Sequence, residues 1–82
     1  MSELKEFTLK IQHEKDHIWV EVEELPGCFA SGADIDELRE ALAEAIGMYL
    51  SDDVRTVQIR NLDFVPPPEM KQVPIRARLV AA

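Results

Sequence analysis

The chain has little cysteine and no long apolar run, and each of these two shortages excludes a class of protein. Cys28 is the only cysteine among 82 residues, which excludes an internal disulfide framework and a metal site built from several cysteines. No apolar run approaches the roughly 18–20 residues that a membrane-spanning helix requires. The first six residues are too polar and too acidic for a secretory signal peptide. We therefore expect a cytoplasmic protein that does not associate with membranes.

Basic residues are also scarce, and they are unevenly distributed. The chain holds 9 Lys and Arg against 16 Asp and Glu, a net charge of −7; residues 1–53 carry −10 and residues 54–82 carry +3. This balance argues against direct nucleic-acid binding, which needs a positive surface, and suits a basic protein partner. A chain of this length forms one domain with a small core, so self-association as a homodimer or homotetramer is expected.

Apolar and polar residues alternate with a period of two in several segments, which indicates half-buried strands. The first two such segments, at 7–12 and 18–23, are separated by a length that suits a hairpin turn. A short strand is expected around 28–31, after the turn residues Pro26 and Gly27. Alternation is partial at 56–62 and clear at 75–80. The apolar members of the clear segments are Phe7, Leu9, Ile11, Ile18, Val20, Val22, Ile75, Ala77 and Leu79.

One amphipathic helix is predicted from about residue 35 to residue 50 or 51. Asp34 suits the N-cap, and Glu37 three residues later resembles the second half of a capping box. Apolar residues recur at spacings of three and four and form one stripe: Ile35, Leu38, Leu42, Ala45, Ile46 and Tyr49. Beyond the helix, Pro66, Pro67 and Pro68 indicate an extended linker inside a tail of residues 54–82. We expect this tail to complete the domain or to exchange with a second copy.

The order and spacing of these features resemble the HicB-like antitoxin family. The resemblance lies in the strand and turn from Trp19 to Cys28, in Ser31 and Gly32, in the acidic helix start at Asp34, and in Ala45-Ile46 and Tyr49-Leu50. It covers about residues 7–50, and the proline-bearing tail echoes the family's link to its last strand. Asp34 replaces the usual threonine cap, Leu38 replaces a common alanine, and residues 54–64 fit the family pattern poorly.

The resemblance implies an α+β fold, with one helix packed on one face of an antiparallel sheet of three to four strands. The chain order would be a hairpin, a short strand, the helix and a C-terminal strand. The implied function is to bind a small, basic HicA-type RNase toxin and to mask its active surface. Longer relatives carry an added DNA-binding module, which we do not expect here. The alternative is an orphan oligomeric module with a regulatory or scaffold role.

The candidate partner-binding residues are Trp19, Glu37, Glu40 and Glu44. At 100° per residue the three glutamates cluster within about 60° of arc opposite the apolar stripe, where they form either a solvated surface or a docking surface for a basic partner. Trp19 is expected on the sheet face that the helix leaves uncovered, where large aromatics often mark an interface. Either a partner or the chain's own C-terminal segment would cover it there.

Catalytic and metal sites have weaker support. Cys28 as a nucleophile would need His13 or His17 as a base, whereas a small buried apolar role explains it more simply. Two histidines beside one turn fall short of the ligands that zinc normally uses. We therefore expect a protein that binds without catalysing a reaction and needs no metal or cofactor.

Overall fold

The computed structural model describes residues 2–60, 62 and 69–81, so the predicted Pro66–Pro68 linker lies outside the described residues. The elements follow the order β1 (Ser2–Glu14), β2 (His17–Val22), β3 (Phe29–Gly32), α1 (Ile35–Tyr49), β4 (Val54–Arg60) and β5 (Lys71–Ala81). The five strands form one sheet in the order β3-β2-β1-β5-β4, and all neighbours are antiparallel. Within the described residues, the α+β class and the single helix are therefore as predicted.

The predicted sheet of three to four strands is too small, because β4 and β5 both belong to it. Val54, Val57 and Ile59 of β4 pack against the core, but an irregularity between Val54 and Thr56 breaks their alternation, and β4 gains its place by pairing with β5. β5 is longer than the predicted 75–80 because its polar first residues pair with β1, as Lys71 does with Ile11. In the structure β5 pairs with β1 of its own chain.

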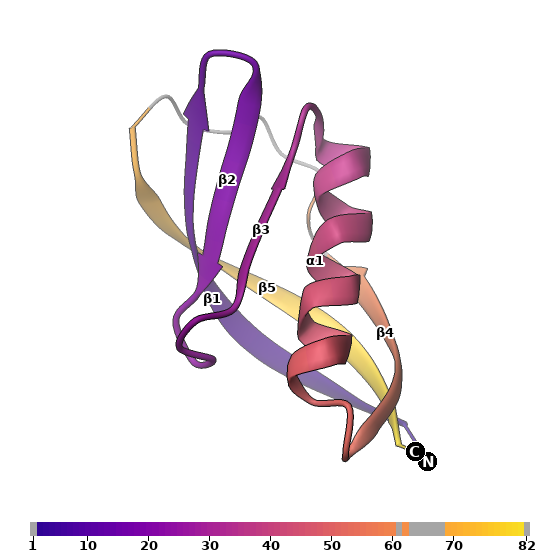
Figure 1. Ribbon diagram of the computed structural model, residues 1–82. Coiled ribbons are helices and arrows are strands. Elements are labelled where there is room, and N and C mark those ends of the chain that lie inside the picture. Colours follow the sequence, from indigo (N-terminus) through magenta and orange to yellow (C-terminus); the bar gives the residue numbers. More distant parts are fainter. Residues whose placement is uncertain (1, 61, 63–68, 82) are drawn as a thin grey trace.

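The alternating residues of the strands build one side of the core. Phe7, Leu9 and Ile11 of β1 are fully buried, and β2 and β5 add their own inward-facing rows. Those rows are Ile18, Val20, Val22, Ile75, Ala77 and Leu79. The residues between these buried ones point to the opposite face of the sheet, and Figure 1 shows that the helix does not cover that face.

The helix builds the other side of the core. Asp34 is its N-cap, with an extended backbone and a side-chain oxygen that accepts a hydrogen bond from the Glu37 N–H at 2.8 Å. Leu38, Leu42 and Ile46, four residues apart, form its buried stripe. The sheet curls so that β3 and β4, its two edge strands, both contact the helix, as Figure 1 shows. The Arg39 guanidinium also donates to the Leu62 carbonyl oxygen at 2.6 Å and so fixes the segment after β4 to the helix.

Among the described residues, no helix has the length and apolar character needed to cross a membrane.

Candidate protein-binding surface

Three exposed glutamates line the solvent side of α1. Glu37, Glu40 and Glu44 lie opposite the buried stripe of the helix, and we call them the acidic stripe. Asp36 is paired with Arg39 at 2.8 Å, whereas no ion pair between described residues involves the acidic stripe. Carboxylates three and four residues apart on a helix repel one another, at a cost of roughly 0.2–0.5 kcal/mol per pair. The stripe is therefore a local destabilisation that the rest of the fold offsets.

The acidic stripe leads into an apolar area at the C-terminal end of the helix. Met48 stands four residues after Glu44, and its side chain is 72% exposed; Tyr49 is 48% exposed. Beside them lies a shallow pocket of about 350 Å³ between the helix and the start of β3. The residues that line it are Gly27, Cys28, Phe29, Ala45, Met48 and Tyr49, and we call it the helix–β3 pocket.

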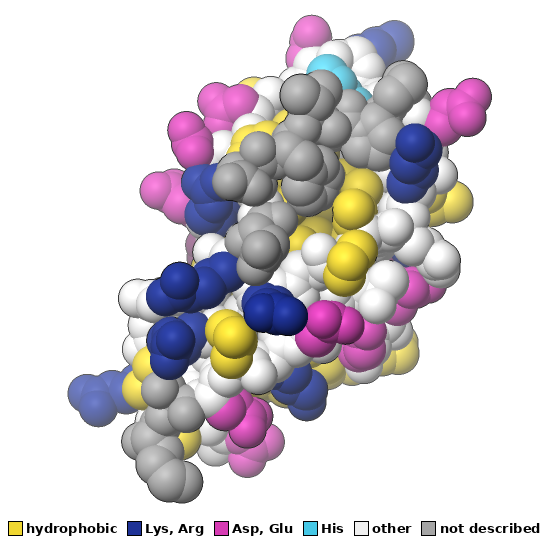
Figure 2. Space-filling view, turned by 180° about the vertical axis from the view of Figure 1, so that it is seen from behind, with side chains coloured by type: hydrophobic (Ala, Val, Ile, Leu, Met, Phe, Trp, Pro, Cys, Tyr) yellow, Lys and Arg dark blue, Asp and Glu magenta, His cyan; other side chains and the backbone are white. Residues whose placement is uncertain are grey.

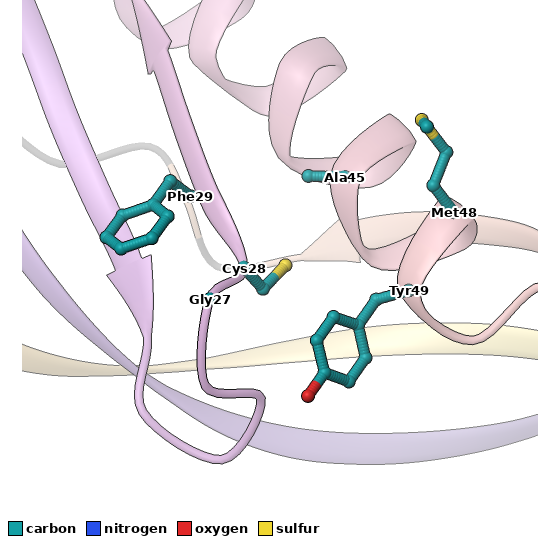
Figure 3. Close-up of a pocket in the computed structure, with 6 residues that line it drawn as sticks. All are labelled: Gly27, Cys28, Phe29, Ala45, Met48 and Tyr49. Carbon is teal, nitrogen blue, oxygen red and sulfur yellow. The ribbon is translucent and has the colours of Figure 1, made fainter.

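The pocket exists because the helix and β3 are close at one end and separate toward the other. At the close end Gly32 lies against the backbone of the helix, so near that a Cβ there would stand 2.5 Å from the Leu38 nitrogen. At the open end the chain enters β3 through Gly27, whose φ of +85° is a conformation that glycine adopts readily. Figure 3 shows the Cys28 side chain pointing from the strand toward the helix, and the Tyr49 ring pointing from the helix toward the strand.

Cys28 forms part of the pocket wall and is only 4% exposed. Burial raises the pKa of its thiol above the ordinary value. A protonated thiol is a poor nucleophile, so the position favours the packing role over the catalytic one. The candidate bases are remote in the sheet, because His17 begins β2 whereas Cys28 follows the turn at the other end of that strand.

Trp19 lies on the far side of the sheet from the acidic stripe. It is half-buried, and its ring contacts Phe29 with 5.6 Å between centroids. In Figure 3 the Phe29 ring points away from the helix, which is consistent with this contact. The structure therefore does not bring Trp19 together with Glu37, Glu40 and Glu44. Phe29 joins the two regions, since it contacts Trp19 and also borders the helix–β3 pocket.

The uncovered face of the sheet carries basic, acidic and hydrophobic side chains together, as Figure 2 shows. Arg76 and Arg78 alternate with the buried residues of β5, and Arg60 stands opposite Arg76 in the β4–β5 register. Glu6 stands opposite Arg76 in the β1–β5 register, and Lys10 lies 4.0 Å from Glu23, so the charges of this sheet face are mixed, whereas the outer side of the helix is acidic.

His13 and His17 do not pair across the hairpin. His13 stands opposite Ile18 and His17 opposite Glu14, and both histidines are exposed. In the described part of the chain no three His, Cys, Asp or Glu residues are grouped in a way that could hold a metal ion.

The sequence predictions missed the apolar half of this surface. Met48 was not selected, and Tyr49 was assigned to the buried stripe, although it is half exposed because it occupies the last helical position. A methionine four residues after Glu44 on the outer face was the available signal. Comparison of the chain with family models, with curated proteins and with solved structures found no match in any of the three.

Proposed function

We propose that this protein is a HicB-like antitoxin, which binds a small basic HicA-type RNase toxin and masks its active surface without catalysing a reaction itself. The observation that carries the proposal is the acidic stripe, which continues into the helix–β3 pocket on the same side of the molecule. The resemblance of residues 7–50 to the family supplies the identity of the partner.

The two halves of the surface suit different parts of the binding reaction. Charge complementarity mainly raises the association rate and selects the partner. Desolvated apolar contacts near the centre of an interface usually carry most of the affinity. The acidic stripe would therefore steer a basic partner, while Met48, Tyr49 and the helix–β3 pocket would hold one of its apolar side chains. The uncovered sheet face, whose charges are mixed, suits a basic partner less well than the helix side.

The proposal predicts that the adjoining reading frame encodes a small basic RNase, and it is tested by titrating the activity of that RNase with the purified chain. A triple variant, Glu37→Lys, Glu40→Lys and Glu44→Lys, removes the acidic stripe. The matched control carries Glu14→Lys, Asp16→Lys and Glu69→Lys, three exposed acids away from the helix. Both variants change the net charge by the same amount, so a difference between them reports position and not total charge.

We expect the unchanged chain to inhibit the RNase stoichiometrically, with an affinity that falls as salt is raised, because salt screens exposed charges. The stripe variant should associate roughly 10- to 1,000-fold more slowly, and the control should stay close to the parent. Met48→Ala should raise the dissociation rate with little change in the association rate. Equal behaviour of the two triple variants would contradict the role of the stripe, and a lack of inhibition by the unchanged chain would contradict the proposal as a whole.

A further inference from the structure

The first half of β1 has an open edge. β1 pairs with β5 from Ser2 to Ile11, but it pairs with β2 only from Leu9 to Glu14. Figure 1 shows this half of β1 running beside β5 past the end of β2. No described strand lies on its other side at residues 2–6. We call this segment the open β1 edge.

The position of Thr8 shows which backbone groups face this edge. Its N–H donates to both carboxylate oxygens of Glu24, at 2.8 and 3.0 Å, and its carbonyl oxygen accepts from the Glu23 N–H at 2.9 Å. The backbone of Thr8 therefore points away from β5. In a strand the backbone N–H and C=O groups of successive residues point to opposite sides. Those of Leu4 and Glu6 therefore point the same way as those of Thr8, toward the open side. Glu24 marks the end of the open edge, since its carboxylate takes the place of a neighbouring strand at Thr8.

The charges along the open β1 edge are complementary to those of a second copy of the same edge running antiparallel to it. Residues 2–6 read Ser-Glu-Leu-Lys-Glu, and Glu3 and Lys5 are exposed on either side of Leu4, which is itself 48% exposed. An antiparallel copy centred on Leu4 places Glu3 opposite Lys5 of the second copy, and Lys5 opposite Glu3 of the second copy. We propose that the open β1 edge is a dimerisation site that pairs antiparallel with the same edge of a second copy, centred on Leu4.

The backbone geometry fits this register. Leu4 would exchange two hydrogen bonds with Leu4 of the second copy, and Glu6 would exchange two with the residue at position 2 on each side. Glu3 and Lys5 then occupy the non-hydrogen-bonded pairs, where facing side chains approach more closely. The exposed Leu4 side chains become neighbours and cover each other in part.

The neighbouring registers are less favourable for electrostatic reasons. Centring on Lys5 places two lysines opposite each other, and centring on Glu3 places two glutamates opposite each other. Like charges directly opposite are destabilising in a sheet, whereas opposite charges contribute favourably. The sequence of the open edge thus selects one register among those that the backbone permits. This inference is independent of the proposed toxin partner.

The first test is a charge exchange followed by sedimentation over a range of concentrations. A strand pair of five residues buries less surface than a standard interface, so we expect a dimer with a dissociation constant of about micromolar or weaker. Glu3→Lys alone and Lys5→Glu alone each place like charges opposite one another at two symmetric sites, and each should weaken the dimer about 5- to 50-fold. The double variant, Glu3→Lys with Lys5→Glu, restores opposite charges and should restore dimerisation. A monomeric parent, or a double variant no better than the single ones, would overturn the proposal.

The second test fixes the register by oxidative cross-linking. In the proposed pairing the two Leu4 Cα atoms lie about 5.5 Å apart, which is within the range of a disulfide. Leu4→Cys should therefore form a cross-linked dimer readily. Glu6→Cys, which is also exposed and on the same face, is the matched control. In the proposed register position 6 lies opposite position 2 of the second copy, so the two introduced cysteines would be four residues apart along the strand, too far for a disulfide. The native Cys28 is buried and should not interfere. Equal cross-linking of the two variants would overturn the register.

Discussion

The contact between Gly32 and the helix offers a sharp test of how α1 is held against the sheet, because the chain contains a matched glycine with the opposite expectation. A Cβ at Gly32 would stand 2.5 Å from the nitrogen and 2.9 Å from the Cα of Leu38, and 3.0 Å from the carbonyl carbon of Glu37. All three atoms are backbone, so no side-chain rotation can relieve the overlap. Gly32→Ala must push the helix away from β3 or distort the strand.

The magnitude follows from this geometry. Overpacking a closely packed site costs typically 1–3 kcal/mol, and a backbone clash belongs near the upper end, at about 2–3 kcal/mol. A domain of this size has a total stability of about 4–12 kcal/mol, so the loss is a large fraction of it. The corresponding fall in Tm is about 10–20 °C.

Gly47→Ala is the control. A Cβ at Gly47 would meet the Val57 Cγ2 at 3.8 Å, an ordinary van der Waals distance, inside a helix where alanine is preferred. It should stabilise the domain by about 0.5–1 kcal/mol. The assay is urea unfolding of both variants beside the parent, followed by circular dichroism. A Gly32→Ala variant within about 0.5 kcal/mol of the parent would refute the close approach of helix and strand.

Three further predictions concern single side chains. Glu40→Gln removes a charge that repels Glu37 and Glu44, so it should stabilise the domain by about 0.5–1 kcal/mol in urea unfolding while slowing association with a basic partner; an unchanged or lower unfolding midpoint would contradict the repulsion. Burial alone would raise the pKa of Glu24, but the hydrogen bonds from Thr8 and the charge of Lys5 outweigh it, and the pKa is lowered from 4.5. This carboxylate therefore contributes stability above pH 4.5, and that stability is lost as the pH falls through its folded-state pKa. In Glu24→Gln the unfolding midpoint should therefore fall less steeply at acidic pH than it does in the parent. Equal slopes for the variant and the parent would contradict this role. The Cys28 thiol should react with a thiol reagent slowly in the folded protein and at the rate of a free thiol after denaturation, whereas rapid native labelling would contradict its burial.

The sequence was sufficient where structure depends on local pattern. The alternation in β1 and β2 located the buried residues of the central strands correctly. The Asp34 cap and the apolar spacing located the helix to within two residues at its end. These features are determined within a few residues of the chain, so no knowledge of distant partners was needed.

The sequence was insufficient where structure depends on pairing between distant segments. The open β1 edge has no apolar alternation, and residues 2–6 form a strand because β5 pairs with them. Pro74 stands inside β5, which is possible because the Thr8 backbone opposite it points away from β5 and β4 pairs only as far as Arg76. The helix–β3 pocket depends on the angle between two elements, which no local pattern encodes.

In the proposed function, the chain acts by holding a basic protein against its helix. We suggest nuclear magnetic resonance of the isotopically labelled chain during titration with the basic HicA-type RNase that is proposed as its partner. If a basic partner binds on the helix side, the backbone signals that change most belong to Glu37, Glu40, Glu44, Met48 and Tyr49, with smaller changes in β3. Changes concentrated instead on the uncovered sheet face, at Arg60 and Arg76, would contradict the proposal.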